Sequence, residues 1–179
     1  MNSAALAPTA DNSQATDSPL PGTVASIARQ SLAPLANRID QDGHYPLDVM
    51  GELGRAGAFS SHLDREGSRF DAALNDMASI SEHCGSTGFM TWCHDVCGLY
   101  MERSGNSALQ ARLEDHASGQ SFGGTGLSNP MKALTNIEKM ALRATPVEGG
   151  HIVSGTLPWV SHINHGHYCG VIAMVCNPD

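Results

Sequence analysis

The stretch MALRATPVEGGHIVSGTLPWVS, residues 140–161, decides the fold prediction for the second half of the chain. It contains short runs of β-branched and apolar residues separated by Gly and Pro, which is typical of strands joined by tight turns. The tripeptide Glu148–Gly150 predicts a hairpin turn between two of these strands. We therefore expect this part of the chain to form a sheet.

The rest of the chain divides into a helical first half and a strand-rich second half. Apolar residues at helical spacing and cap signals predict five helices, the first of them kinked at Pro34, over residues 23–39, 46–57, 71–84, 86–105 and 106–119. Gly, Pro and Asn punctuation predicts five strands, over residues 121–126, 139–145, 149–156, 157–161 and 167–176. Because helices and strands are segregated rather than alternating, we expect an α+β protein, in which an N-terminal all-α helical bundle precedes a partial antiparallel β-barrel or sandwich domain.

The predicted boundaries give three segments. Residues 1–22 are rich in Ala, Ser, Thr, Asn and Pro and are expected to form a disordered leader. Residues 23–119 form the helical domain, and residues 120–179 form an incomplete β domain.

Composition excludes several classes of partner. The chain has 179 residues, 41% of them hydrophobic, and a formal net charge of −8 without a Lys/Arg cluster, so we expect no binding to nucleic acid or to an anionic membrane. Five cysteines without a CxxC pair favour reduced thiols. No secretory signal or transit peptide is recognisable at the N-terminus, and the protein is expected to be cytoplasmic.

Trp159 and Ser161 are the first candidate site residues. On a strand they would project from the same face, with Val160 on the opposite face. An indole beside a hydroxyl suits a flat heteroaromatic ligand such as a flavin ring. The alternative is that Trp159 fills the β core and Ser161 ends the strand. Nearby, the glycines at 123, 124 and 126 would let a strand end approach a flat ligand closely, with Thr125 as the polar side chain.

Histidines and cysteines offer weaker candidates. A metal could be bound by His162, His165 and His167, but a carboxylate or third ligand at a diagnostic spacing is lacking. We therefore interpret these histidines as solvated loop residues and expect no metal site. Cys93 and Cys97 lie on an apolar helical stripe and are expected to pack in the core. Cys93 and His94 are adjacent, so their side chains diverge and do not form a nucleophile pair. The carboxylates of Asp64, Glu66 and Glu82 are expected to be solvated.

Several of these segments together resemble the acyl-CoA dehydrogenase family of flavoproteins. DQDGHYPLDVMGELGRAGAFSSHLDREG and MERSGNSALQARLEDHASGQ are similar to segments of the family's helical domain, and FGGTG and MALRATPVEGGHIVSGTLPWVS are similar to segments of its middle β domain. The resemblance covers about residues 23–179, and its most specific part is the order of Gly-Gly, Ser-Gly and Pro-Trp-Val-Ser.

The resemblance implies FAD as cofactor and an acyl-CoA or related small molecule as substrate, in fatty-acid metabolism, with a homo-oligomer as the complete form. It also implies that the Trp-Val-Ser step lies against the flavin ring and that the first strand's Thr and neighbouring amides bind the ring edge. The implied cofactor-binding residues are Phe122, Gly124, Thr125, Gly126, Trp159, Val160 and Ser161.

Departures from the family pattern leave the chemistry open. Thr125 is followed by GLSNPMK where the family has EPGAGSD, and the chain ends before the family's C-terminal helices, which carry the catalytic glutamate. We expect an oxidoreductase for CH–CH groups of acyl thioesters, in a truncated form that lacks the base and is inactive alone, so no catalytic residue is assigned. The alternatives are a flavin-dependent monooxygenase of the same superfamily and a non-catalytic subunit-interaction module.

Overall fold

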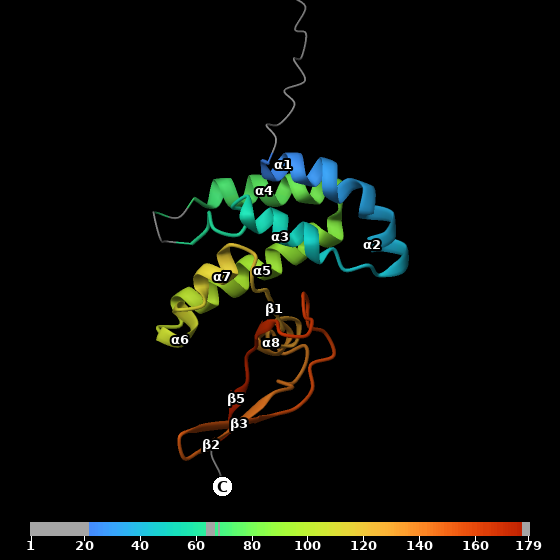
Figure 1. Cartoon of the computed structure of the whole chain (residues 1–179). Helices are drawn as coiled ribbons and strands as arrows, with labels where there is room; N and C mark the ends of the chain where they lie inside the picture. Colours follow the sequence, from blue (N-terminus) through green and yellow to red (C-terminus); the bar gives the residue numbers. More distant parts are fainter. Residues whose placement is uncertain (1–21, 64–66, 68, 177–179) are drawn as a thin grey trace, which may run out of the picture.

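The computed structural model describes residues 22–63, 67 and 69–176. The predicted leader, Asp64 and Glu66 lie outside the described residues, apart from Gly22 at the end of the leader. The helical half comes first along the chain and the strands lie together below it (Figure 1). None of the helices in the described part of the chain combines the length and the hydrophobicity that crossing a lipid bilayer requires.

The first helical segment is interrupted where the sequence predicts a kink. It consists of α1 (Val24–Ile27), a π-helical turn η1 (Ala28–Leu32), a 3₁₀ turn η2 (Ala33–Leu35) and α2 (Ala36–Asp42). Pro34 lacks an N–H and its ring would collide with a carbonyl one turn earlier, so the regular α-helical ladder cannot continue through it. The helix ends at Gly43, which adopts a left-handed φ of 65°.

The remaining helices of this half are α3 (Leu47–Arg55), α4 (Phe70–His83), α5 (Gly85–Arg103), α6 (Ser107–Gln110) and α7 (Leu113–Ala117). The predicted fourth helix is confirmed as α5, which contacts α4, α6 and α7 and also the strands β1 and β4. Cys84, with extended backbone, separates α4 from α5. Gly88 brings the two helices close together, because a Cβ there would overlap the side chain of Ser81.

The hydrophobic core lies in the helical half. Its larger cluster joins residues from α1, η1, α2, α3, α4 and the start of the second half, namely Val24, Ala28, Leu32, Ile39, Val49, Met50, Leu53, Ala58, Phe59, Ile80, Cys84 and Phe122. A smaller cluster forms around the end of α5 and contains Leu63, Cys97, Met101, Leu113 and Ala117. Cys93 and Cys97 are therefore buried, as their helical spacing predicts.

As far as residue 176, the second half contains two small sheets and one helix. β1 (Gly123–Thr125) pairs in parallel with β4 (Tyr168–Gly170), and α8 (Ser128–Leu134) follows β1. The second sheet has the order β3-β2-β5, in which β2 (Arg143–Val147) pairs antiparallel with β3 (Gly150–Ser154) and parallel with β5 (Met174–Val175). The hairpin predicted at Glu148–Gly150 is confirmed by the pairing of Val147 with Gly150.

The helical first half followed by a partial sheet region is confirmed, but the strand pairing differs in detail from the expectation. Among the described residues the β1–β4 sheet is parallel, the β3-β2-β5 sheet is mixed, and the two do not close into a barrel. Parallel pairs arise because long connections return the chain beside β1 and β2 in the same direction. The helix α8 was not predicted; Pro130 is compatible with it because proline is tolerated in a helix's first turn.

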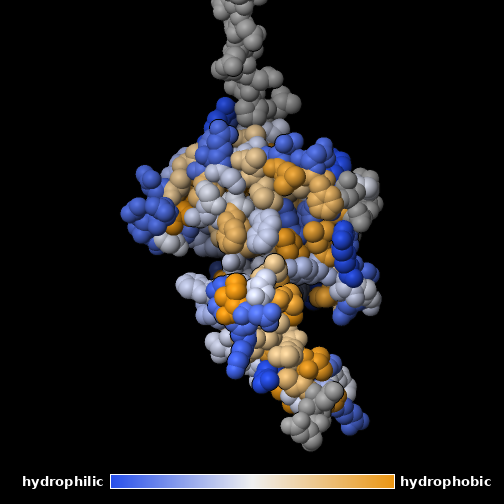
Figure 2. Space-filling view, turned by 180° about the vertical axis from the view of Figure 1, so that it is seen from behind, coloured by the Kyte–Doolittle hydropathy of each residue, from blue (hydrophilic) through white to orange (hydrophobic). Residues whose placement is uncertain are grey.

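The sheet half exposes much of its apolar surface. All five residues of β3 are exposed, including Ile152 and Val153, and so are Met174 and Val175 of β5. Hydrophobic surface continues over the narrow lower part of the molecule as well as over the helical half (Figure 2).

Candidate functional site

The site begins with a bridge between β1 and the segment that contains Trp159. The N–H of Thr125 donates to the carbonyl of Ser161 at 3.2 Å, and the N–H of Ser161 donates to the carbonyl of Thr125 at 3.1 Å. This isolated antiparallel bridge is the only strand-like pairing of residues 157–161 among the described residues, so the strand predicted there is wrong. Pro158 contributes to this result because it has no N–H to donate to a ladder.

Trp159, Thr125 and Ser161 line one groove, whose volume is about 370 Å³. The indole of Trp159 is 71% exposed, so it does not fill a β core. The other lining residues are Phe89 and Trp92 from α5, Leu127, and Ser128 and Met131 from α8. The structure therefore brings the indole and both hydroxyl residues of the predicted site together.

Two glycines allow this close packing. A Cβ at Gly124 would overlap the carbonyl oxygen of Ser161 and would lie 2.7 Å from that of His162. A Cβ at Gly126 would lie 2.7 Å from Cδ1 of Leu157. The absence of side chains at these positions lets β1 approach residues 157–162 directly.

Phe122 and Val160 do not line the groove. Phe122 is 6% exposed and belongs to the helical core, where its ring lies near those of His94 and His162. Val160 is half-buried and lies near Gly126. The amide of Thr125 donates to Ser161 and that of Gly126 donates to Gly170 at 2.8 Å, so both are already engaged within the protein. The polar side-chain groups of the residues that line the groove are three hydroxyls, from Thr125, Ser128 and Ser161, and the indole N–H groups of the two tryptophans.

Cys93 lies behind the two hydroxyl residues. Its side chain is fully buried. Burial raises the pKa of this thiol, so it stays protonated at neutral pH, although the nearby hydroxyls of Ser161 and Thr125 lower the pKa by a smaller amount. The thiol thus lies close to both sides of the bridge.

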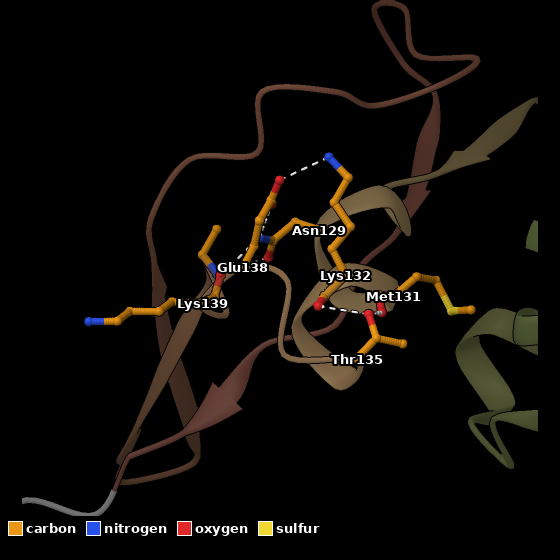
Figure 3. A network of polar contacts seen from close by, with 7 residues as sticks. Asn129, Met131, Lys132, Thr135, Glu138 and Lys139 are labelled. Atoms are coloured by element: carbon orange, nitrogen blue, oxygen red, sulfur yellow. Dashed lines mark hydrogen bonds and ion pairs between the residues drawn. The ribbon is translucent and has the colours of Figure 1, made fainter.

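The groove is electrically neutral. None of its lining residues is ionisable, and the cation on the adjoining helix, Lys132, pairs with Glu138 at 2.8 Å. Glu138 also accepts a hydrogen bond from Asn129, whose amide in turn contacts the backbone of Lys139 and Ala141 (Figure 3). Asn129 therefore anchors α8 to the chain that follows it.

A cluster of buried histidines lies beneath β1, and the sequence analysis missed it. His162 is 6% exposed, so the expectation of a solvated loop residue is wrong for this position. Its Nδ1–H donates to the carbonyl of Gly123 at 2.9 Å, and its Nε2 therefore accepts from the hydroxyl of Tyr45 at 2.7 Å. Burial, followed by the nearby His167, lowers the pKa of His162 to about 4.

His94 and His116 continue this cluster. Their rings stack with centroids 3.7 Å apart and planes 14° apart, and the Nε2–H of each donates to the other's backbone carbonyl, at 3.0 and 2.9 Å. Nδ1 of His94 accepts from the amide of Gly123 at 3.3 Å. Burial is the main cause that lowers the pKa of both imidazoles, that of His116 to about 4. Both rings are therefore neutral at pH 7.

A periodic signal for this cluster was present in the sequence. Residues 87, 91, 94, 98 and 101 follow helical spacing and are all buried in α5. The periodicity of apolar residues does not reveal this stripe, because Thr, His and Gly occupy most of it. Two further buried groups lie beside it, His62, which approaches Gly98, and Asp95 of α5 itself, and their Nδ1 and Oδ1 atoms lie 3.7 Å apart.

The histidines do not form a metal site in the part of the chain that the structure describes, where no group of three His, Cys, Asp or Glu side chains is placed to hold an ion. His165 is exposed, and the imidazoles of His162 and His94 each use both ring nitrogens within the protein. The cluster instead fixes the position of Gly123 from both sides.

Comparison with known proteins assigns the chain to a family. The sequence profile described as acyl-CoA dehydrogenase, N-terminal domain, matches residues 17–120. The chain is 28% identical over 148 residues to mitochondrial isovaleryl-CoA dehydrogenases of Solanum tuberosum and Arabidopsis thaliana, covering 78% of this chain and 36% of each relative. It thus spans about a third of the length of these curated relatives.

The fold agrees with this result. The structure of butyryl-CoA dehydrogenase from Megasphaera elsdenii superposes with a TM-score of 0.66 at 17% identity, over 76% of this chain and 38% of that protein. The helical half and the partial sheet region thus have the arrangement found in butyryl-CoA dehydrogenase. Since the profile matches more than half of the sequence, the chain belongs to the acyl-CoA dehydrogenase family.

Proposed function

We propose that this chain provides the flavin-binding wall of an acyl-CoA dehydrogenase-like oxidoreductase, with FAD as cofactor. The observation that carries the proposal is the groove in which the exposed indole of Trp159 lies beside the bridged residues Thr125 and Ser161. Their arrangement fits a flat ring with polar edges, because it combines an aromatic surface with two hydroxyl groups. FAD, when bound, accepts a hydride from the substrate.

Each predicted residue has a distinct task in this proposal. Trp159 packs against the ring, and the hydroxyls of Ser161 and Thr125 form hydrogen bonds to its edge. Gly124 and Gly126 keep the two backbone segments close enough to form one wall. Phe122 and Val160 act from behind that wall, since their side chains lie outside the groove.

The substrate class and the assembly follow from the family and stay part of the proposal, and the location is proposed from the cysteines. The reaction class is the oxidation of a CH–CH bond of an acyl thioester, carried out in a homo-oligomer. The unpaired state of all five cysteines suits a reducing compartment, which supports a cytoplasmic protein. The proposal assigns no proton-abstracting residue to the described part of this chain.

Intrinsic fluorescence tests the flavin site, because both tryptophans of the chain line the groove. FAD titrated into the 179-residue chain should quench tryptophan emission saturably. Ser161→Ala should weaken FAD binding about three- to tenfold, which corresponds to one lost hydrogen bond. The matched control is Leu74→Ala, at a 63% exposed position on α4 outside the groove, and it should leave the affinity unchanged. Equal affinities of all three proteins, or a chain that FAD does not quench, would refute the proposal.

A flavin-dependent monooxygenase is the second candidate. The segment after Thr125 favours this candidate. It forms the start of α8, and the side chain of Asn129 there anchors the helix to the backbone of Lys139 and Ala141 instead of binding a ligand. Oxygen consumption with reduced FAD, compared with dye reduction driven by butyryl-CoA in a full-length homologue, separates the two reaction classes.

A further inference from the structure

The groove contains more aromatic surface than the flavin wall requires. Phe89 and Trp92 of α5 stack with centroids 5.6 Å apart and planes 19° apart. They are 53% and 39% exposed, although α5 buries most of its other side chains against neighbouring elements. Together with Trp159 they give this groove three of the nine aromatic residues of the chain. These rings therefore add exposed aromatic surface to the groove beside Trp159.

The remaining lining matches a ring rather than a charged group. Met131 provides a thioether, which makes favourable contacts with aromatic rings. Ser128 adds a hydroxyl beside those of Thr125 and Ser161, and none of the lining residues is ionisable. A neutral group with a hydrogen-bonding substituent would therefore be the best partner for this surface.

We propose that Phe89 and Trp92 bind a flat aromatic group of the substrate beside the flavin, in preference to a linear acyl chain. This inference rests on the proposed flavin site and names the substrate class of that site. Offset and edge-to-face ring contacts stabilise an aromatic group beyond the effect of area burial, and an aliphatic chain cannot form them. A flexible chain also loses more rotamer entropy when it is immobilised.

The aromatic group can belong to a free small molecule or to an acyl thioester. The pairing of Lys132 with Glu138 leaves the groove rim on α8 without an uncompensated cation for phosphate. Two probes distinguish these sources: 2-naphthol is a free aromatic compound, and 3-phenylpropanoyl-CoA carries a ring on a thioester. Butyryl-CoA provides the linear comparison.

Isothermal titration of the 179-residue chain with each probe, with and without saturating FAD, tests the inference. We expect saturable binding of at least one aromatic probe, and 3-phenylpropanoyl-CoA should bind at least tenfold more tightly than butyryl-CoA if the thioester is the source. Phe89→Leu and Trp92→Leu should each weaken the aromatic probe about two- to tenfold. Both changes should weaken the binding of butyryl-CoA less than they weaken the binding of the aromatic probe.

The control variant is again Leu74→Ala, which removes an exposed apolar side chain outside the groove. The inference is overturned if neither aromatic probe binds. It is also overturned if 2-naphthol does not bind and butyryl-CoA binds as tightly as 3-phenylpropanoyl-CoA. A Trp92→Leu chain that binds the aromatic probe like the parent chain would overturn it as well. Aromatic binding that persists in a chain that FAD does not quench would refute the flavin site while supporting the aromatic site. Quenching by FAD without aromatic binding would do the reverse.

Discussion

The hydroxyl of Tyr45 donates a 2.7 Å hydrogen bond to Nε2 of His162, and this contact joins the segment before α3 to the residue that follows Ser161. His162 has a left-handed φ of 57°, which is uncommon for a residue other than glycine. Its second hydrogen bond, to the carbonyl of Gly123, reaches the first residue of β1. The helical half thus positions both segments that form the proposed flavin wall.

Removal of the phenolic hydroxyl tests this connection. Tyr45→Phe leaves Nε2 of the buried His162 without its donor, so the free energy of unfolding should fall by about 1–3 kcal/mol at pH 7. Urea denaturation measures the change. An unchanged midpoint would show that the contact does not contribute to stability.

The histidine cluster predicts a loss of stability in acid. The folded-state pKa of His162 is about 4, below the ordinary value of 6.5, so the unfolded chain binds the extra proton first and stability is lost as the pH falls below 6.5. Between pH 7 and pH 5 the titration of His162 should lower the free energy of unfolding by about 2 kcal/mol. The groups that face it are Tyr45, His94, His116 and His167.

His162→Asn isolates that contribution. Asn tolerates a left-handed φ and its amide can donate to Gly123, but it does not titrate. The variant should therefore lose less stability between pH 7 and pH 5 than the parent chain. His165→Asn, at an exposed position nearby, should follow the parent curve. Identical slopes for the parent chain and His162→Asn would contradict the assignment.

The buried carboxyl of Asp95 predicts that stability depends on pH in the opposite direction. Burial raises the pKa of its carboxyl to about 8, with a further contribution from Asp76, so the folded state keeps a proton that the unfolded state releases near pH 4. Stability from this group is present in acid and is lost as the pH rises through 8. Asp95→Asn keeps the shape without the charge and should be more stable than the parent chain at pH 8, by about 2 kcal/mol or more. Thermal unfolding at pH 5 and pH 8 measures the difference, which should shrink at the lower pH.

Gly124 predicts a steric effect on the wall itself. Gly124→Ala places a Cβ against the carbonyl of Ser161, so the bridge between Thr125 and Ser161 must open. We expect a loss of about 1–3 kcal/mol in stability together with loss of FAD quenching. Gly150→Ala is the matched control, because a Cβ there meets nothing within 4 Å. A Gly124→Ala chain that binds FAD like the parent would show that the two segments need not approach so closely.

Local patterns predicted much of the fold. The periodicity of α5, the helix break near Pro34 and the hairpin at Glu148–Gly150 depend on neighbouring residues, and each is found in the structure. The parallel pairing of β1 with β4 depends on a contact between residues more than 40 positions apart, which no local pattern encodes.

The candidate site was predictable only in part, because some of its residues are recognisable from the local sequence and others depend on contacts between distant segments. Trp159, Ser161 and Thr125 stand out by residue type, and the structure places them in one groove. Phe89 and Trp92 were assigned only to a helix, since their exposure depends on which face of α5 the other elements cover. The buried state of His162 likewise results from packing against Tyr45 and Phe122, which lie far away in sequence.

The two reciprocal hydrogen bonds between His94 and His116 have an evolutionary consequence. Each imidazole donates to the backbone carbonyl of the other residue, so replacing one histidine alone leaves the carbonyl of the remaining one without this donor and leaves a void against the remaining ring. Substitutions at the two positions should therefore be inherited together, and close relatives of this chain should show the pair either intact or jointly exchanged for two residues of matching volume.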